Sequence, residues 1–184
     1  MGDEGARVAG ARRTREALLE AAAQVFAERG VQAPVRDIAG RAGVGVGTVY
    51  RHFPDRAELV IAVYRHQIDE CAALAEELTG SPEPGQALER WICAFVEFLV
   101  TKHGLGVALQ SDDMSLRSLH SLMLDTLVPA CGRLVDGAVA RGELDPGVTA
   151  YALMRAVGNL CLLGPGYDRE DAHAMVARLL AGCR

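Results

Sequence analysis

Hydrogen-bonding side chains gather between residues 48 and 52 of this chain. Thr48 carries a hydroxyl, Tyr50 a phenol, Arg51 a guanidinium and His52 an imidazole. These groups can donate hydrogen bonds, but they form neither a nucleophile–base arrangement nor a pair of carboxylates. Thr48 can bond a base edge or a phosphate, and it also offers a methyl group. The chemistry that this run suits is binding rather than catalysis.

The glycine-rich lead-in to this run, Gly43 to Thr48, superficially suggests a loop that cradles a phosphate. No strand pattern precedes it, and neither G-x-x-x-x-G-K-[ST] nor G-x-G-x-x-G is spelled. The sequence therefore predicts no nucleotide site there.

The elements that must position these side chains lie within residues 35–53. Ile38, Ala39 and Ala42 recur at i, i+1 and i+4, which predicts one face of a short helix. Gly43 ends that helix, because glycine readily takes the left-handed conformation of a helix end. A second helix begins near residue 46 with the same apolar spacing. A small residue, a glycine turn and a second apolar helix in this order predict a helix-turn-helix.

Together with a helix predicted over residues 14–29, the segment resembles the DNA-binding domain of the TetR/AcrR family of bacterial transcription regulators. The resemblance covers about the first third of the chain, and the remainder resembles the family's variable ligand-binding domain in length and helical character. The matching residues are Phe26, Gly30, Asp37, Ile38, Ala39, Ala42, Gly43, Val44, Gly47, Thr48, Val49, Tyr50, His52, Phe53, Glu58 and Leu59.

The resemblance implies that the second helix of the motif enters the major groove of DNA. Tyr50 and His52 would then bond phosphates, with Arg36 and Arg56 beside them. The alternatives are a core tyrosine at position 50 and a surface histidine at position 52. The candidate DNA-binding residues are Arg36, Gly45, Val46, Gly47, Thr48, Tyr50, Arg51, His52 and Arg56.

The chain departs from the family pattern in two places. Ala33 and Pro34 stand where the family often has Thr or Ser, whose hydroxyl caps the helix and bonds a phosphate. Val46 offers no hydrogen bond to a base, although it can touch a thymine methyl. Direct readout is therefore expected to be sparse, and Arg51 or sequence-dependent DNA shape would have to supplement it.

Charge is distributed unevenly along the 184 residues. The net charge is −5, but residues 1–54 contain eight Arg and six Asp or Glu, while the rest of the chain is acidic. A positive surplus thus lies where DNA phosphates would be met. The five cysteines are widely spread without a C-x-x-C pair, so we expect neither a metal site nor a disulfide framework, and no cofactor.

The predicted fold is all-α, with about nine helices. We expect a disordered N-terminal tail over 1–11, a three-helix DNA-binding domain over 12–55, and a helical effector-binding and dimerisation domain over 56–184. Arginines at the end of the tail could touch DNA or simply be solvated. No run of about 18 apolar residues and no secretory signal is present, which predicts a cytoplasmic protein without a membrane span. Helices are expected over 14–29, 35–42, 46–53, 55–78, 86–102, 105–110, 116–141, 149–162 and 170–181.

Aromatic and thioether side chains on the later helices predict either a cavity for a small, largely apolar effector or an ordinary core. His120 and Asn159 are its polar candidates. The candidate effector-binding residues are Trp91, Phe95, Phe98, Met114, His120, Met123, Leu124, Leu127, Met154 and Asn159. The last two helices are expected to pair two copies into a homodimer, as the resemblance implies. The candidate dimer residues are Leu153, Val157, Leu160, Val176, Leu179 and Leu180.

These features predict a homodimeric regulator, most simply a repressor that a small molecule releases from a palindromic operator in double-stranded DNA. The first alternative is an effector-independent or architectural helical DNA-binding protein, which would bind DNA without regard to sequence. The second, a small helical enzyme, is disfavoured because no nucleophile elbow, metal-ligand spacing or paired carboxylate occurs.

Overall fold

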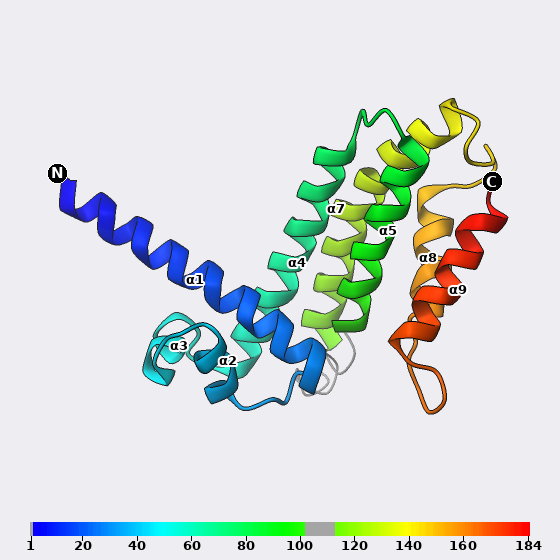
Figure 1. Ribbon diagram of the computed structural model, residues 1–184. Coiled ribbons are helices and arrows are strands. Elements are labelled where there is room, and N and C mark those ends of the chain that lie inside the picture. Colours follow the sequence, from blue (N-terminus) through cyan, green and yellow to red (C-terminus); the bar gives the residue numbers. More distant parts are fainter. Residues whose placement is uncertain (1, 102–112) are drawn as a thin grey trace. The chain divides into compact units, whose positions relative to one another are not determined.

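The computed structural model describes residues 2–101 and 113–184, and within these residues it contains eight helices (Figure 1). The all-α prediction is therefore confirmed for the described part of the chain, while the helix predicted over 105–110 lies outside it. The helices are α1 (Gly2–Arg29), α2 (Val35–Arg41), α3 (Val46–His52), α4 (Arg56–Leu78), α5 (Pro84–Thr101), α7 (Asp113–Ala140), α8 (Ala150–Leu160) and α9 (Arg169–Gly182).

The described helices fall into two compact units. The first contains α1, α2, α3 and α4 as far as His66, and the second contains the rest of α4 together with α5, α7, α8 and α9. We predicted a boundary at residue 55, before α4. The structure instead divides that helix, because Leu59, Val60 and Val63 on its first turns are buried with the first unit.

The first unit is built by one apolar face from each helix. Leu18 and Phe26 of α1, Ile38 of α2 and Val49 of α3 are all at most 4% exposed. Both α2 and α3 are only seven residues long, too short to be stable in isolation. Their helical structure therefore depends on burial, with α2 packed against α1 and α3 against α2.

The turn between α2 and α3 is fixed by backbone geometry. Gly43 has φ +68° and donates its N–H to the carbonyl of Gly40 at 3.3 Å. Val44 donates to the carbonyl of Ala39 at 3.0 Å. This pair of bonds around a left-handed residue is the Schellman motif, and it satisfies carbonyls that the helix end would otherwise leave open.

The second unit is a bundle in which α5 contacts α7, α8 and α9, and α8 also contacts α7 and α9. Its centre is aromatic: Trp91 and Phe95 are stacked at 5.4 Å between ring centroids, and both are at most 1% exposed. Trp91 donates its indole N–H to the carbonyl of Cys71 at 2.8 Å, which joins α5 to the second half of α4. A buried indole needs such a partner, since an unpaired donor would cost free energy.

At the N-terminus the structure differs from the predicted disordered tail. Residues 2–11 continue α1 without interruption. The segment contains three alanines, which favour helices, and no proline. Helix propagation from residue 14 costs less than starting a new helix, which accounts for the difference.

The turn between α2 and α3 yields a test with a matched control. Gly43→Ala forces a side chain into the left-handed region and should lower the free energy of unfolding by about 1–2 kcal/mol. Gly40→Ala should raise it by up to about 1 kcal/mol, because Gly40 lies in α2 with open space at its Cβ position. Thermal unfolding followed by circular dichroism measures both. Equal shifts in the two variants would contradict this assignment of the turn.

Candidate functional site

The outer face of α3 carries most of the predicted DNA-binding side chains. Val46 is 41% exposed and Tyr50 51%, and Arg51 is also exposed, whereas Val49 on the opposite face is 1% exposed. Gly45 and Gly47 leave the first turn of this face without bulk. The geometry thus presents a short helix whose N-terminal half could approach a groove closely.

The remaining α3 candidates are partly covered. Thr48 and His52 are half-buried, and the His52 ring lies 6.3 Å from the ring of Phe53, centroid to centroid. Tyr50 is not a core tyrosine, because half of its surface is open to solvent. Its hydroxyl is therefore available to a partner outside the unit.

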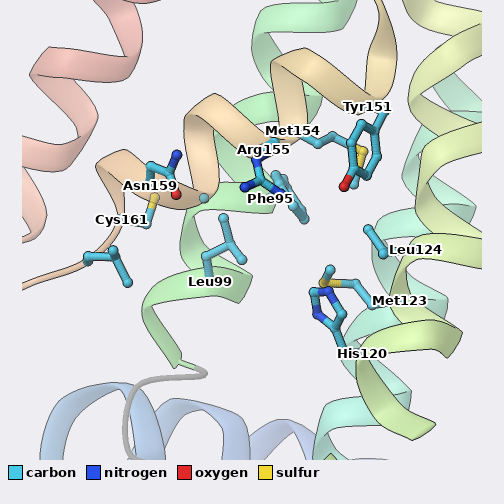
Figure 2. Close-up of a pocket in the computed structure, with 12 residues that line it drawn as sticks. Phe95, Leu99, His120, Met123, Leu124, Tyr151, Met154, Arg155, Asn159 and Cys161 are labelled. Carbon is cyan, nitrogen blue, oxygen red and sulfur yellow. The ribbon is translucent and has the colours of Figure 1, made fainter. Parts of the chain in front are cut away.

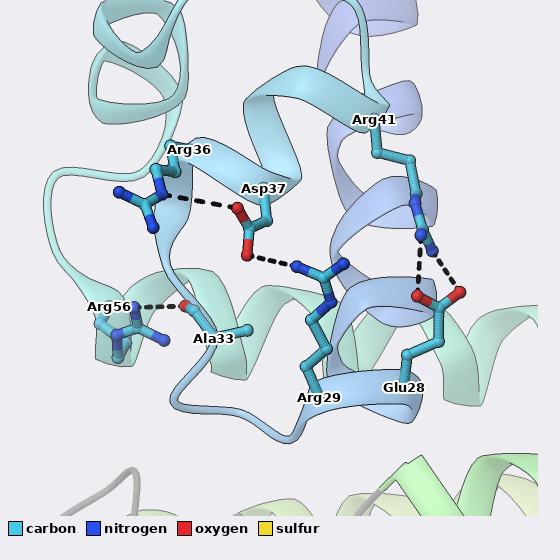
Figure 3. Close-up of polar contacts among 7 residues, drawn as sticks. All are labelled: Glu28, Arg29, Ala33, Arg36, Asp37, Arg41 and Arg56. Carbon is cyan, nitrogen blue, oxygen red and sulfur yellow. Dashed lines mark hydrogen bonds and ion pairs between the residues drawn. The ribbon is translucent and has the colours of Figure 1, made fainter.

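Three arginines between α1 and α2 differ in what holds them (Figure 3). Arg41 forms a two-pronged hydrogen bond with Glu28, at 2.6 and 2.8 Å, and this contact lowers the pKa of the Glu28 carboxyl. Arg29 bonds Asp37 at 2.8 Å. Arg36 reaches the other oxygen of Asp37 only at 3.7 Å, and its side chain is 80% exposed. Of these three guanidiniums, that of Arg36 is the one most open to an incoming anion.

Arg56 makes contacts within the chain that the sequence did not predict. It donates to the carbonyls of Val31 and Ala33, the latter at 2.7 Å, and is half-buried (Figure 3). Its guanidinium thus ties the start of α4 to the loop between α1 and α2. The sequence placed Arg56 correctly in the first turn of α4, but the helical position does not reveal the backbone acceptors that the loop brings to it.

A pocket of about 460 Å³ opens in the second unit, between α5, α7 and α8 (Figure 2). Its size falls within the usual range for small-molecule sites. Six predicted effector-binding residues line it: Phe95, His120, Met123, Leu124, Met154 and Asn159. The structure also adds six that the prediction did not include: Leu99, Tyr151, Arg155, Gly158, Cys161 and Leu162.

Three predicted effector residues do not line this pocket. Trp91, Phe98 and Leu127 are at most 2% exposed and belong to the core. The side chain of Met114 lies outside the described part of the structure. Apolar periodicity does not separate the residues that line the pocket from those of the core, because both follow the same 3.6-residue repeat.

Cys161 contributes an uncharged wall to the pocket. Burial, with a smaller contribution from the charge of Glu97, raises the pKa of its thiol to about 11. Both oxygens of Glu97 are themselves engaged, by Arg169 at 3.2 Å and by His173 at 2.7 Å.

The five cysteines are all free thiols, and in the described ranges no group of three His, Cys, Asp or Glu side chains is arranged to hold a metal ion.

The predicted dimer residues are mostly occupied within the chain. Leu153, Val157, Val176 and Leu180 are at most 6% exposed, and only Leu160 and Leu179 are half-buried. The apolar stripes of α8 and α9 therefore face α5, α7 and each other, and four of the six predicted residues are already buried within their own chain. No helix among residues 2–101 and 113–184 is long and apolar enough to span a bilayer.

Comparison with known proteins yields two family matches. The model described as "Bacterial regulatory proteins, tetR family" matches residues 18–63, and "Transcriptional regulator SbtR-like, C-terminal domain" matches residues 83–184. The first match contains α2 and α3, and the second contains every residue that lines the pocket.

Individual relatives are similar over different lengths. The transcriptional repressor KstR2 of Mycobacterium tuberculosis is 36% identical over 115 residues, which is 61% of this chain but only 58% of the relative. The transcriptional activator FasR of Mycolicibacterium smegmatis is 30% identical over 78% of this chain and 66% of its own. The crystal structure of the TetR transcriptional regulator SCO0520 from Streptomyces coelicolor is 29% identical, with a TM-score of 0.79 over 92% of this chain and 98% of that one.

The two arginines that differ in their contacts should differ in their effect on stability. Arg56→Met leaves two loop carbonyls without their charged donor and should lower the free energy of unfolding by about 2 kcal/mol. Arg36→Met should change it by no more than about 0.5 kcal/mol, because this side chain is open to solvent. Chemical denaturation of both variants provides the comparison. A neutral Arg56→Met would refute the structural role given to that residue.

Proposed function

The chain belongs to the TetR family of bacterial regulatory proteins, and we propose that it is a cytoplasmic repressor that a small molecule releases from a palindromic DNA operator. Membership in this family identifies the chain as a transcriptional regulator and not an enzyme. The proposal rests mainly on the outward face of α3. The turn at Gly43 orients this helix so that its opposite face is buried. The chain matches 58% of the length of the similar repressor and 66% of that of the similar activator. Because one relative represses and the other activates, repression is part of the proposal.

The proposed DNA contact places the N-terminal half of α3 in the major groove. Tyr50 and Arg36, both exposed, would bond phosphates on either side. Thr48 would contribute the readout of bases, with a methyl from Val46. Arg56 is left out of this interface, because its guanidinium is already bonded within the unit.

The proposed effector site is the pocket between α5, α7 and α8. A ligand there regulates DNA binding only if it binds one state of the protein more tightly than the other, and a coupling of about 1–3 kcal/mol is typical. Helix α4 contributes residues to both units and is therefore a continuous covalent path from the second unit to the first.

Selection of bound sequences from random duplex DNA tests this function directly. Recovery of one palindrome would support a specific dimeric regulator and would supply its operator. Binding without any recovered motif would instead favour the architectural alternative. Failure to bind any duplex would contradict the proposal for the free protein.

Variants of the α3 surface should separate positioning from readout. Arg36→Ala should weaken binding to all duplexes and reduce the slope of log K against log salt by about one. Tyr50→Phe should weaken binding to all duplexes about fivefold, and Thr48→Ala should instead change the selected sequence. Fluorescence anisotropy at several salt concentrations measures these effects, with Arg133→Gln of the second unit as the control. If all three variants bind like the parent protein, α3 is not the recognition helix.

We propose a dimer surface on α8 and α9 that differs from the predicted one. It uses the exposed side of these helices, where small residues permit close helix packing and one large apolar side chain reaches solvent. Met175 of α9 is 37% exposed. The small residues are Ala152, Ala156, Ala174, Ala177 and Ala181, all exposed or half-buried.

A single large charge should prevent this pairing. Ala177→Arg places a guanidinium on the exposed side of α9 and should convert the dimer into a monomer at micromolar concentration. Ala73→Arg, on the exposed side of α4, is the matched control and should remain dimeric. Size-exclusion chromatography with light scattering reports the mass. A dimer that survives Ala177→Arg would place the interface elsewhere.

A further inference from the structure

The pocket in the second unit has two chemically different sides. Phe95 and Leu99 of α5 and Met123 of α7 supply hydrocarbon and a thioether, and each is at most 9% exposed. Met154 and the neutral thiol of Cys161 extend this apolar wall along α8. Such a wall fits a hydrocarbon or aromatic body and offers it little polar competition.

The other side is a polar row on α8. Tyr151, Arg155 and Asn159 follow one another at i, i+4 and i+8, which places them on one face of the helix. Figure 2 shows these three side chains along one edge of the pocket, with His120, Met123 and Leu124 across from them. Arg155 lies in the middle of this row and is the one member of the row that carries a fixed positive charge.

No carboxylate among the described residues that line the pocket balances that guanidinium. Among the twelve described lining residues none is Asp or Glu, and no hydrogen bond or ion pair joins Arg155 to another described residue. Other arginines of this unit do have partners: Arg169 bonds Glu97, and Arg184 bonds Glu89. An arginine without an anion beside an apolar cavity is an arrangement that an incoming anion would complete.

We infer that the effector is an apolar carboxylate. Arg155 binds its acid group, and its hydrocarbon body fills the pocket against the wall formed by α5 and α7. The planar guanidinium can grip both oxygens of a carboxylate, and Asn159 and Tyr151 lie one turn away on either side to donate further hydrogen bonds. This inference rests on the proposed function, because it assigns the chemical class of the effector for that same pocket.

The size of the pocket narrows this class. At about 30 Å³ for each water-sized group, 460 Å³ holds roughly 15 such groups. A medium-chain fatty acid or a phenylalkanoic acid has about this size. A thioester of coenzyme A is several times larger and lacks the free carboxylate, so it serves as a contrasting ligand.

The competing explanation is that Arg155 is only a solvated surface side chain, since this residue is exposed. An exposed ion pair contributes little, whereas one completed against an apolar wall contributes more. The two explanations differ in one measurable respect. A solvated arginine makes affinity indifferent to the charge of the ligand, whereas a binding arginine makes the acid bind more tightly than its neutral ester.

Isothermal titration calorimetry of the full-length protein without DNA tests the inference. The probes are decanoate and 4-phenylbutyrate, with their methyl esters and decanoyl-coenzyme A as contrasts. We expect each acid to bind at least tenfold more tightly than its ester, which is about 1.4 kcal/mol. Arg155→Gln should abolish this preference while leaving ester affinity unchanged. Arg133→Gln, an exposed arginine farther along α7, should preserve it.

Four results would each overturn the inference. They are equal affinity for acid and ester, a preference for the acid that survives Arg155→Gln, tighter binding of the thioester than of the acid, and no binding of either acid. Unchanged melting temperatures of both variants exclude misfolding as the cause. Operator release is measured separately. Acids that bind without releasing the operator would contradict the proposed regulation only, while release by neutral or cationic compounds alone would contradict the carboxylate assignment only.

Discussion

The left-handed backbone at Gly43 is the constraint on which the first unit depends. Helices α2 and α3 are too short to persist alone, so their relative orientation is set by the two hydrogen bonds of the turn and by burial against α1. That orientation turns Val49 inward and Tyr50 outward. A change in the turn would therefore rotate the recognition surface without altering any residue on it.

The spacing of apolar residues and glycines predicted those features of the first unit that depend on neighbouring residues. The helix-turn-helix and the glycine at its turn follow from spacing within a few residues, whereas the outward position of Tyr50 was implied only by the resemblance to the family. The role of Arg56 did not follow from spacing, because its acceptors are carbonyls more than twenty residues earlier in the chain, and backbone groups leave no sequence signal. Resemblance to the family located the motif, but it did not indicate that Arg56 bonds these carbonyls.

The second unit shows where apolar periodicity stops being informative. Helix α8 has a core side at Leu153 and Val157, a pocket side at Tyr151 and Arg155, and an exposed side at Ala152. The 3.6-residue repeat identifies only the first of these. Four of the six predicted dimer residues are therefore core residues, and the charged member of the pocket wall went unnoticed because it interrupts the apolar pattern.

The bonds from Arg56 have a consequence for how this loop can change over generations. Both acceptors are main-chain carbonyls, at residues 31 and 33, so the contact depends on the path of the backbone and not on the side chains there. Point substitutions that preserve the path would leave it intact. Insertion or deletion of one residue would displace both carbonyls together, so drift in this loop should proceed by exchange of residues at constant length.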